Sequence, residues 1–286
     1  MPDLFSYSKI NTFKNCTELY HINYIDKIRK ENENIEAFLG SCVHYVIEEI
    51  YNQKNDGINF DEMIYMYNKI WNQRWHDNIF LAQMPQYNKN HQRKIKKNED
   101  RLSKKRAQYF QLGITCLKNF YDKNLSEKSD IFKYTIANEL DMNFKFKGVN
   151  FRGIIDRLEF NKDLNEYTIH DYKTSKRIIT PNKAKRDLQL GLYLIGVEQK
   201  FNAENINLKW HFLQYGVEVC VRPSIEDIDY IKRKLVSDAK NIIELSSEKH
   251  NFSPKETPLC YWCHYWEECT AKTTSNPARR LPNANY

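Results

Sequence analysis

The clearest alternation of apolar and polar positions lies between Phe151 and Ser175. Residues 151–160 and 166–175 each predict a strand, and the turn-forming residues 161–165 between them predict a β-hairpin. Strand side chains repeat every second residue, so shared faces are expected for Ile154, Asp156, Leu158 and Phe160 on the first arm and for Tyr167, Ile169, Asp171 and Lys173 on the second.

Two acids in this hairpin lie on otherwise apolar faces. A turn centred near Asp163 sets Asp156 opposite Asp171, with cross-strand Cβ atoms about 5 Å apart. Buried like charges are costly unless a cation lies between them, which favours a functional site. The alternative is that Asp171 and Lys173 form an exposed strand pair while Asp156 bonds to Arg157 or to a turn.

The rest of the chain predicts helices before the hairpin and alternating elements after it. The expected elements are a helix capped by Ser8 within 6–24, a helix over 36–51, helical sequence over 61–120, a strand over 135–146, a basic mobile loop over 176–187 with Pro181, a helix from 187 or 188 to 199, a strand over 209–221, and a helix over 224–248 capped by Ser224. This order predicts an α/β core with a helical insertion.

Composition limits the class of protein only loosely. The 286 residues are 41% hydrophobic, and 44 Lys and Arg against 37 Asp and Glu give a net charge of +7. Such a charge is compatible with a phosphate-rich partner but does not require one. The sequence has neither an apolar run of about 18 residues nor a signal-peptide pattern, so a cytoplasmic protein is expected.

A basic segment lies within the predicted insertion, from Asn88 to Arg106. One interpretation is a solvated helix face, and the other is an electrostatic wall along a nucleic-acid strand. The residues that we consider for DNA binding there are Lys94, Lys97, Arg101 and Lys105.

Three of the seven cysteines are clustered near the C-terminus, at Cys260, Cys263 and Cys269. Thiolates at this spacing can chelate one metal ion or cluster, and clustered cysteines in a reducing compartment indicate metal rather than disulfides. Cys16 is the best candidate for a fourth ligand, although His264 could complete a zinc site. An all-thiolate set with aromatic neighbours favours an iron–sulfur cluster over zinc.

The order of several motifs resembles that of RecB-like nucleases in the PD-(D/E)XK superfamily. The motifs are His44 after Gly40, Asp156 in Gly-Ile-Ile-Asp-Arg, the run Asp171-Tyr172-Lys173-Thr174-Ser175, and Gln189-Leu-x-x-Tyr193. The cysteine triplet with a distant Cys16 is similar to the 4Fe–4S staple of the branch that includes AddB nuclease domains and CRISPR-associated RecB-like nucleases. The resemblance spans Ser6 to Cys269. It departs from the family in the long insertion after His44 and in having Asp rather than Glu in the D-x-K element.

The resemblance implies a site and an organisation for the whole chain. Mg²⁺ or Mn²⁺ would be held by Asp156, Asp171, His44 and the Tyr172 carbonyl, with Glu139 as an outer-sphere or second-metal ligand. Lys173 would orient water or offset charge, held by Gln189 and Tyr193. The implied fold is a restriction-endonuclease-like core, a mixed sheet flanked by helices. The further implied features are one domain over 1–270, a helical insertion over 52–134, a cluster-binding part over 1–24 and 250–270, a tail over 271–286, and DNA contacts at Lys176 and Arg177.

The implied activity is metal-dependent hydrolysis of DNA, by an exonuclease or end-processing enzyme acting on single strands or ends. The alternatives are a non-catalytic nucleic-acid-binding module on the same fold and a zinc-stapled regulator. The sequence lacks a phosphate-binding Gly-rich loop with Lys, so a helicase motor would be a separate partner in DNA repair, recombination or CRISPR function.

Overall fold

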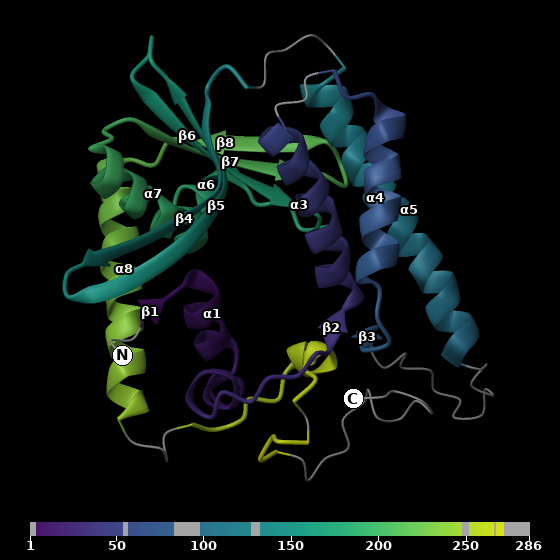
Figure 1. Cartoon of the computed structure of the whole chain (residues 1–286). Helices are drawn as coiled ribbons and strands as arrows, with labels where there is room; N and C mark the ends of the chain where they lie inside the picture. Colours follow the sequence, from purple (N-terminus) through teal and green to yellow (C-terminus); the bar gives the residue numbers. More distant parts are fainter. Residues whose placement is uncertain are drawn as a thin grey trace.

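The structure is a computed structural model that describes residues 4–53, 57–82, 98–126, 132–247, 252–265 and 267–271, with side chains in α5 from Lys104 onward. One mixed sheet lies at its centre (Figure 1). Its strands are β1 (Leu4–Phe5), β4 (Thr135–Phe146), β5 (Val149–Asn161), β6 (Glu166–Lys173), β7 (Ile206–Phe212) and β8 (Val217–Val221).

Strand β5 has two different neighbours along one of its edges. Antiparallel β4 follows one edge of β5 over most of its length. On the other edge, β1 pairs in parallel near Phe151, and β6 pairs antiparallel from Arg157 onward. Between these two partners, no described strand pairs with residues 152–156 on this edge, so the backbone of β5 is open there. β7 then pairs in parallel with β6, and β8 pairs antiparallel with β7.

Helices cover both faces of the sheet and form two hydrophobic cores (Figure 1). The larger core packs α7 (Leu188–Phe201) and α8 (Ile225–Ser246) against sheet residues such as Ile169 and Leu208. The second core packs α3 (Ile35–Gln53), α4 (Phe60–Arg74) and α5 (Asn98–Asn124) around Tyr172 of the sheet. The predicted α/β core, a mixed sheet flanked by helices, is confirmed.

The insertion predicted over 52–134 contains α4, α5 and the short strand β3 (Ile79–Phe80), which pairs in parallel with β2 (Glu33–Asn34). Residues 83–97, with Lys94 and Lys97, lie outside the described residues, as do 272–286 of the predicted tail. No helix in the described part of the chain is long and apolar enough to cross a membrane.

The N-terminal helices lie beside the C-terminal segment. The chain continues from β1 through α1 (Tyr7–Asn15), α2 (Thr17–Tyr20) and the π-helix η1 (His21–Ile25). The 3₁₀-helix η3 (Pro258–Trp262) belongs to the C-terminal segment. Thr17 and Ser253 exchange hydrogen bonds of 2.8 and 3.1 Å, and Lys30 lies 2.8 Å from Glu268. Segments almost a chain length apart are therefore in direct contact.

Three local predictions are wrong. Lys209 to Val221 is not one strand, because the chain reverses at Gly216, whose φ of +60° suits a residue without Cβ. Helix α1 is capped by Ser6 rather than Ser8, since Ser6 Oγ accepts a hydrogen bond from the Lys9 amide at 3.1 Å. The basic connection after β6 contains a short helix, α6 (Pro181–Ala184), which begins with proline at its first position.

Candidate active site

The hairpin of β5 and β6 brings together the two acids singled out in the sequence. Arg157 pairs with His170, so one step further along the ladder Asp156 stands opposite Asp171, in the predicted register. The strands begin to separate there, and Asp156 Oδ2 accepts a hydrogen bond of 2.7 Å from the Tyr172 amide. A side chain thus replaces the regular backbone pairing at the point where the two acids meet.

The regular alternation of β5 also breaks at Asp156. Ile155 and Leu158 are three residues apart, yet both are fully buried in the larger core. The predicted face is therefore wrong in part, because Ile154 is 42% exposed while Leu158 is buried. On β4, the residue opposite Asp156 is Glu139, which has a φ of +44°, rare outside glycine. Such local backbone strain is often found at functional sites.

Helix α3 supplies an imidazole to the same place. His44 Nε2 lies 2.7 Å from the Tyr172 carbonyl oxygen, and His44 Nδ1 lies 3.7 Å from Asp156 Oδ2. The helix approaches closely because Gly40 has no side chain: a Cβ there would be 3.3 Å from Thr174 Oγ1. The residues proposed as metal ligands on α3, β5 and β6 therefore face one another.

Helix α7 contributes the remaining polar groups. Lys173 Nζ donates to Asp171 Oδ1 at 2.8 Å and to Gln189 Oε1 at 3.1 Å. Gln189 Nε2 in turn lies 3.2 Å from Asp171 Oδ1 and donates to Tyr193 Oη at 3.2 Å. Asp187 caps this helix and accepts hydrogen bonds from the amides of its first turn. Lys173 and Asp171 are thereby held in one fixed geometry.

The carboxyl group of Asp171 has the features of a metal ligand. Its Oδ2 atom is buried and has no hydrogen-bond partner among the described residues. Burial raises the pKa of its carboxyl to about 7; Lys173 opposes the shift and Asp156 adds to it. A buried acceptor without a donor is costly, and a divalent cation would satisfy it.

Glu139 belongs to the same acidic group. Ligand atoms of His44, Glu139 and Asp156 all lie within 4.8 Å of one another. Burial raises the pKa of Glu139 to about 7, and the carboxylate of Asp156 acts in the same direction. Two carboxyls with raised pKa values thus flank Asp156, and a bound cation would favour the charged form of each.

Lys173 responds to these acids in the opposite direction. Burial by itself lowers the pKa of an ammonium group, but Asp171, Asp156 and Asp187 more than compensate, and the pKa of Lys173 is raised. Lys173 therefore remains charged at neutral pH, so it is suited to offsetting negative charge rather than to accepting a proton.

A second polar group, which sequence reasoning missed, lies on the opposite face of the same strands. Arg157 Nη1 binds Glu159 at 2.7 Å, and its Nη2 lies 2.7 Å from His170. His170 lies 2.9 Å from His211, whose other ring nitrogen lies 2.9 Å from Glu218. The available signal was a polar residue beside each site acid, Arg157 after Asp156 and His170 before Asp171, in strands that are otherwise apolar.

The basic residues considered for DNA binding are only partly placed. Lys176 and Arg177 are exposed just beyond β6, next to the site. Lys105 is half-buried on α5, while the side chain of Arg101 lies outside the described part. Among these residues, Lys176 and Arg177 are the exposed ones nearest in sequence to the Asp171–Lys173 segment.

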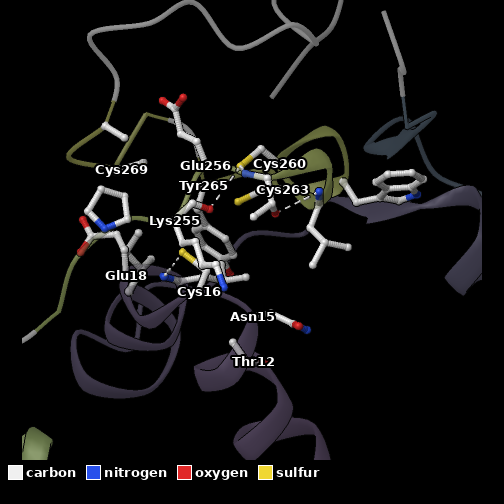
Figure 2. A pocket seen from close by; sticks show the side chains of 17 residues that line it. Thr12, Asn15, Cys16, Glu18, Lys255, Glu256, Cys260, Cys263, Tyr265 and Cys269 are labelled. Carbon is white, nitrogen blue, oxygen red and sulfur yellow. Dashed lines mark hydrogen bonds between the residues drawn. The ribbon is translucent and has the colours of Figure 1, made fainter.

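The four cysteines predicted to bind a cluster line one cavity of about 220 Å³ between the N-terminal helices and η3. Cys16 comes from the junction of α1 and α2, and Figure 2 shows its side chain pointing toward Cys260 and Cys263. Cys269 joins them from the following turn, while His264 is not part of the cavity wall. All four thiols are free, and burial raises the pKa of Cys263 to about 11.

The protein has an α/β fold built on a mixed sheet. Its acidic site, an Asp-x-Lys strand beside a second aspartate, lies where β5 and β6 separate. The family model of the PD-(D/E)XK nuclease superfamily matches residues 4–270. The chain therefore belongs to this superfamily, and it is a nuclease by family.

Two solved structures match the chain to different extents. A candidate exonuclease from Eubacterium rectale superposes with a TM-score of 0.50 at 12% sequence identity, covering 92% of this chain and 87% of that one. At this identity the similarity concerns the fold alone. The structure of SSO0001 has a TM-score of 0.33 at 19% identity, covering 61% of this chain and 82% of that one, and is too distant to inform the fold. No curated protein matches the sequence.

Proposed function

We propose that the protein is a metal-dependent deoxyribonuclease that hydrolyses phosphodiester bonds in single-stranded DNA or at DNA ends. The observation that carries this proposal is the buried Asp171 Oδ2 atom, which has no described partner and lies beside Asp156 and Lys173. A protein that only binds nucleic acid has no need for a desolvated pair of carboxylates, which costs stability. Within this proposal, the enzyme acts as an exonuclease or as a DNA-end-processing nuclease.

The residues fit a hard divalent cation, Mg²⁺ or Mn²⁺. Asp156, Asp171 and the Tyr172 carbonyl offer oxygen ligands, and the His44 imidazole suits Mn²⁺ especially. Glu139 adds an acid within reach of His44 and Asp156, as an outer-sphere or second-metal ligand. When bound, such an ion polarises the phosphodiester and lowers the pKa of a bound water.

Lys173 offsets the negative charge that develops on the phosphate. Its ammonium is fixed by Asp171 and Gln189, so little reorganisation is needed during the reaction. Tyr193 orients the Gln189 amide through their hydrogen bond. The exposed Lys176 and Arg177 beyond β6 contact the DNA backbone in this proposal. Any motor function would come from a separate partner such as a helicase. A recombination or CRISPR protein is a further possible partner in this proposal.

The test is cleavage of end-labelled single- and double-stranded DNA with Mg²⁺ or Mn²⁺. Asp171→Asn and Lys173→Met should each reduce the rate at least about 100-fold, the range seen for groups that stabilise developing charge. Asp163→Asn, at the exposed hairpin turn, is the matched control and should cleave normally. Full activity of Asp171→Asn would refute the assignment, and DNA binding without cleavage by the wild type would indicate the non-catalytic module.

We also propose that Cys16, Cys260, Cys263 and Cys269 bind a 4Fe–4S cluster. The four thiols line one cavity, and His264, the alternative ligand for zinc, does not. The Leu19 amide donates to Cys16 Sγ and the Thr257 amide to Cys260 Sγ, both at 3.5 Å. Backbone hydrogen bonds to sulfur of this kind tune iron–sulfur clusters.

The cluster is tested by iron, sulfide and zinc analysis of protein purified without oxygen. About four iron atoms and four sulfides per chain are expected for such a cluster. Cys263→Ser should abolish iron binding, whereas Cys220→Ser, at an exposed cysteine of β8, should retain it. Stoichiometric zinc without iron would show that the site is a zinc staple instead.

A further inference from the structure

A cavity of about 320 Å³, lined by both polar and apolar groups, opens next to the candidate active site. Ser6, Tyr7 and Ser8 form one wall, at the start of α1. Gln189 and Tyr193, which belong to the active-site hydrogen-bond network, form another part of its wall. The cavity and the site therefore share two side chains, and the volume is in the range of pockets that take small ligands, about 300 to 1,000 Å³.

The floor of the cavity is the open stretch of β5 between its contacts with β1 and β6. Gly153 lies there, and a Cβ at this position would be only 2.6 Å from Cδ1 of Tyr193. The absent side chain lets the Tyr193 ring lie against the strand. The neighbouring Ile154 is 42% exposed and offers an apolar surface at the cavity rim.

The lining has the chemistry of an anion site. Hydroxyls, an amide and one guanidinium line the cavity, and none of its lining residues is acidic. The Arg152 guanidinium is tied on its Nε and Nη2 atoms to Asp141, at 3.0 and 2.9 Å, so it is held in place at the cavity edge. Ser6 Oγ and Ser8 Oγ are hydrogen-bonded to each other at 2.8 Å, and Ser6 Oγ also accepts from the Lys9 amide, so Ser8 can donate to a ligand when Ser6 donates to Ser8.

Tyr7 connects this cavity with the reacting groups. Its ring is half-buried against the larger core, and its hydroxyl makes no hydrogen bond to any described residue. Burial raises the pKa of Tyr7; Asp187 and Asp171 act in the same direction and Lys173 opposes them. The hydroxyl therefore stays protonated at neutral pH and can donate to an oxygen anion beside the site.

We propose that this cavity is a nucleotide subsite, in which Tyr7 and Ser8 bind the phosphate next to the scissile phosphodiester. The inference rests on the proposed nuclease function and extends it to the path of the substrate. A strand that places one phosphate at Asp171 and Lys173 continues over the wall formed by Gln189 and Tyr193. Its next phosphate then meets the hydroxyls of the N-terminal segment, and Ile154 contacts the sugar or base.

The experiment is cleavage of oligonucleotides in which a single linkage at a time is an uncharged methylphosphonate. In the wild type, one linkage adjacent to the cut should lower kcat/KM about tenfold, the effect of losing one hydrogen bond to a charged oxygen. Tyr7→Phe and Ser8→Ala should cleave the unmodified strand about tenfold more slowly. In each variant the penalty for the modified linkage should be clearly smaller than in the wild type, because one of the two contacts with that phosphate is already lost.

Tyr215→Phe, at an exposed tyrosine in the turn after β7, is the matched control and should keep the full penalty. Thermal melts check that Tyr7→Phe folds, and Ser8→Ala, at an exposed position, gives an independent reading. Equal penalties in the wild type and both variants, or no penalty at any adjacent linkage, would overturn the subsite while leaving the nuclease. A wild type that cleaves no DNA would overturn both.

Discussion

Two arginines on β5 provide a direct measure of what the buried polar group contributes to stability. Arg157 is 3% exposed and pairs with Glu159, whereas Arg152 is 47% exposed and pairs with Asp141 through two hydrogen bonds. Both arginines lie on the same strand and each forms an ion pair, so burial, with the contacts that it brings, is the main difference between them. Methionine keeps the aliphatic stem and removes the charge.

Arg157→Met should destabilise the protein strongly. Breaking a buried ion pair from one side costs about 3–5 kcal/mol, because the remaining charge is left without a partner. The side chain of Glu159 is 24% exposed and keeps its contact with His170 Nε2 at 3.0 Å, so we expect about 2–3 kcal/mol here. The loss of the Arg157 contact with the Tyr51 ring, at 4.9 Å, acts in the same direction.

Arg152→Met should change stability little, since exposed pairs contribute little even when bidentate. Urea unfolding followed by circular dichroism at neutral pH gives both values, and an unchanged m-value shows that the unfolded state is comparable. Equal losses in the two variants would refute the argument that burial decides the contribution. Arg157→Met should also reduce cleavage, because Arg157 and His170 flank Asp156 and Asp171 on the two strands.

Three further predictions concern other parts of the structure. Burial lowers the pKa of His211 to about 4, so below about pH 6.5 this residue binds a proton in the unfolded chain but not in the folded chain. In thermal melts, the stability of the wild type relative to His211→Gln should therefore fall as pH drops from about 6.5 to 4, while the raised pKa values of Asp171 and Glu139 act in the opposite direction in both proteins. Gln189→Ala should lower kcat about tenfold to a hundredfold with a smaller change in KM, in steady-state cleavage assays, since it frees Lys173 without removing it. Gly113→Ala should lose about 1–3 kcal/mol in urea unfolding, although this change normally favours a helix, because the new Cβ would lie 2.0 Å from the Tyr67 hydroxyl.

The sequence predicted the hairpin and its register because strand alternation and turn chemistry are local signals. The opposition of Asp156 and Asp171 followed from turn length alone. The face of Ile154 did not, because the alternation of β5 breaks at Asp156, beside Glu139 of another strand, and no local pattern signals this break. The reversal at Gly216 had a local signal, a glycine after polar residues, which the apolar pattern on either side concealed.

The site was predictable as a set of residue types, but not as a geometry. His44 lies on a helix that is distant in sequence, and its contact with Tyr172 depends on how α3 packs against the sheet. The subsite at Tyr7 gave no signal beyond a helix start, since its neighbours Gln189 and Tyr193 come from the other half of the chain. Residues brought together by packing of this kind are not encoded by spacing along the chain.

Helix α1 links the proposed subsite to the proposed cluster, because Ser6 and Tyr7 lie at its start and Cys16 at its end. Its nine residues span about 14 Å at the usual helical rise. Two contacts hold it independently of any metal: Ile10 and Phe13 are buried in the larger core, each worth about 1.5–3 kcal/mol, and β1 pairs with β5 just before it. Cluster removal should therefore loosen the segments around Cys16 and Cys260, measurable as faster amide exchange, while Tyr7 stays in place. If the core holds α1, the protein without iron should still cleave the methylphosphonate linkage more slowly than the natural one. If that difference in kcat/KM disappears with the iron, the cluster and not the core positions α1.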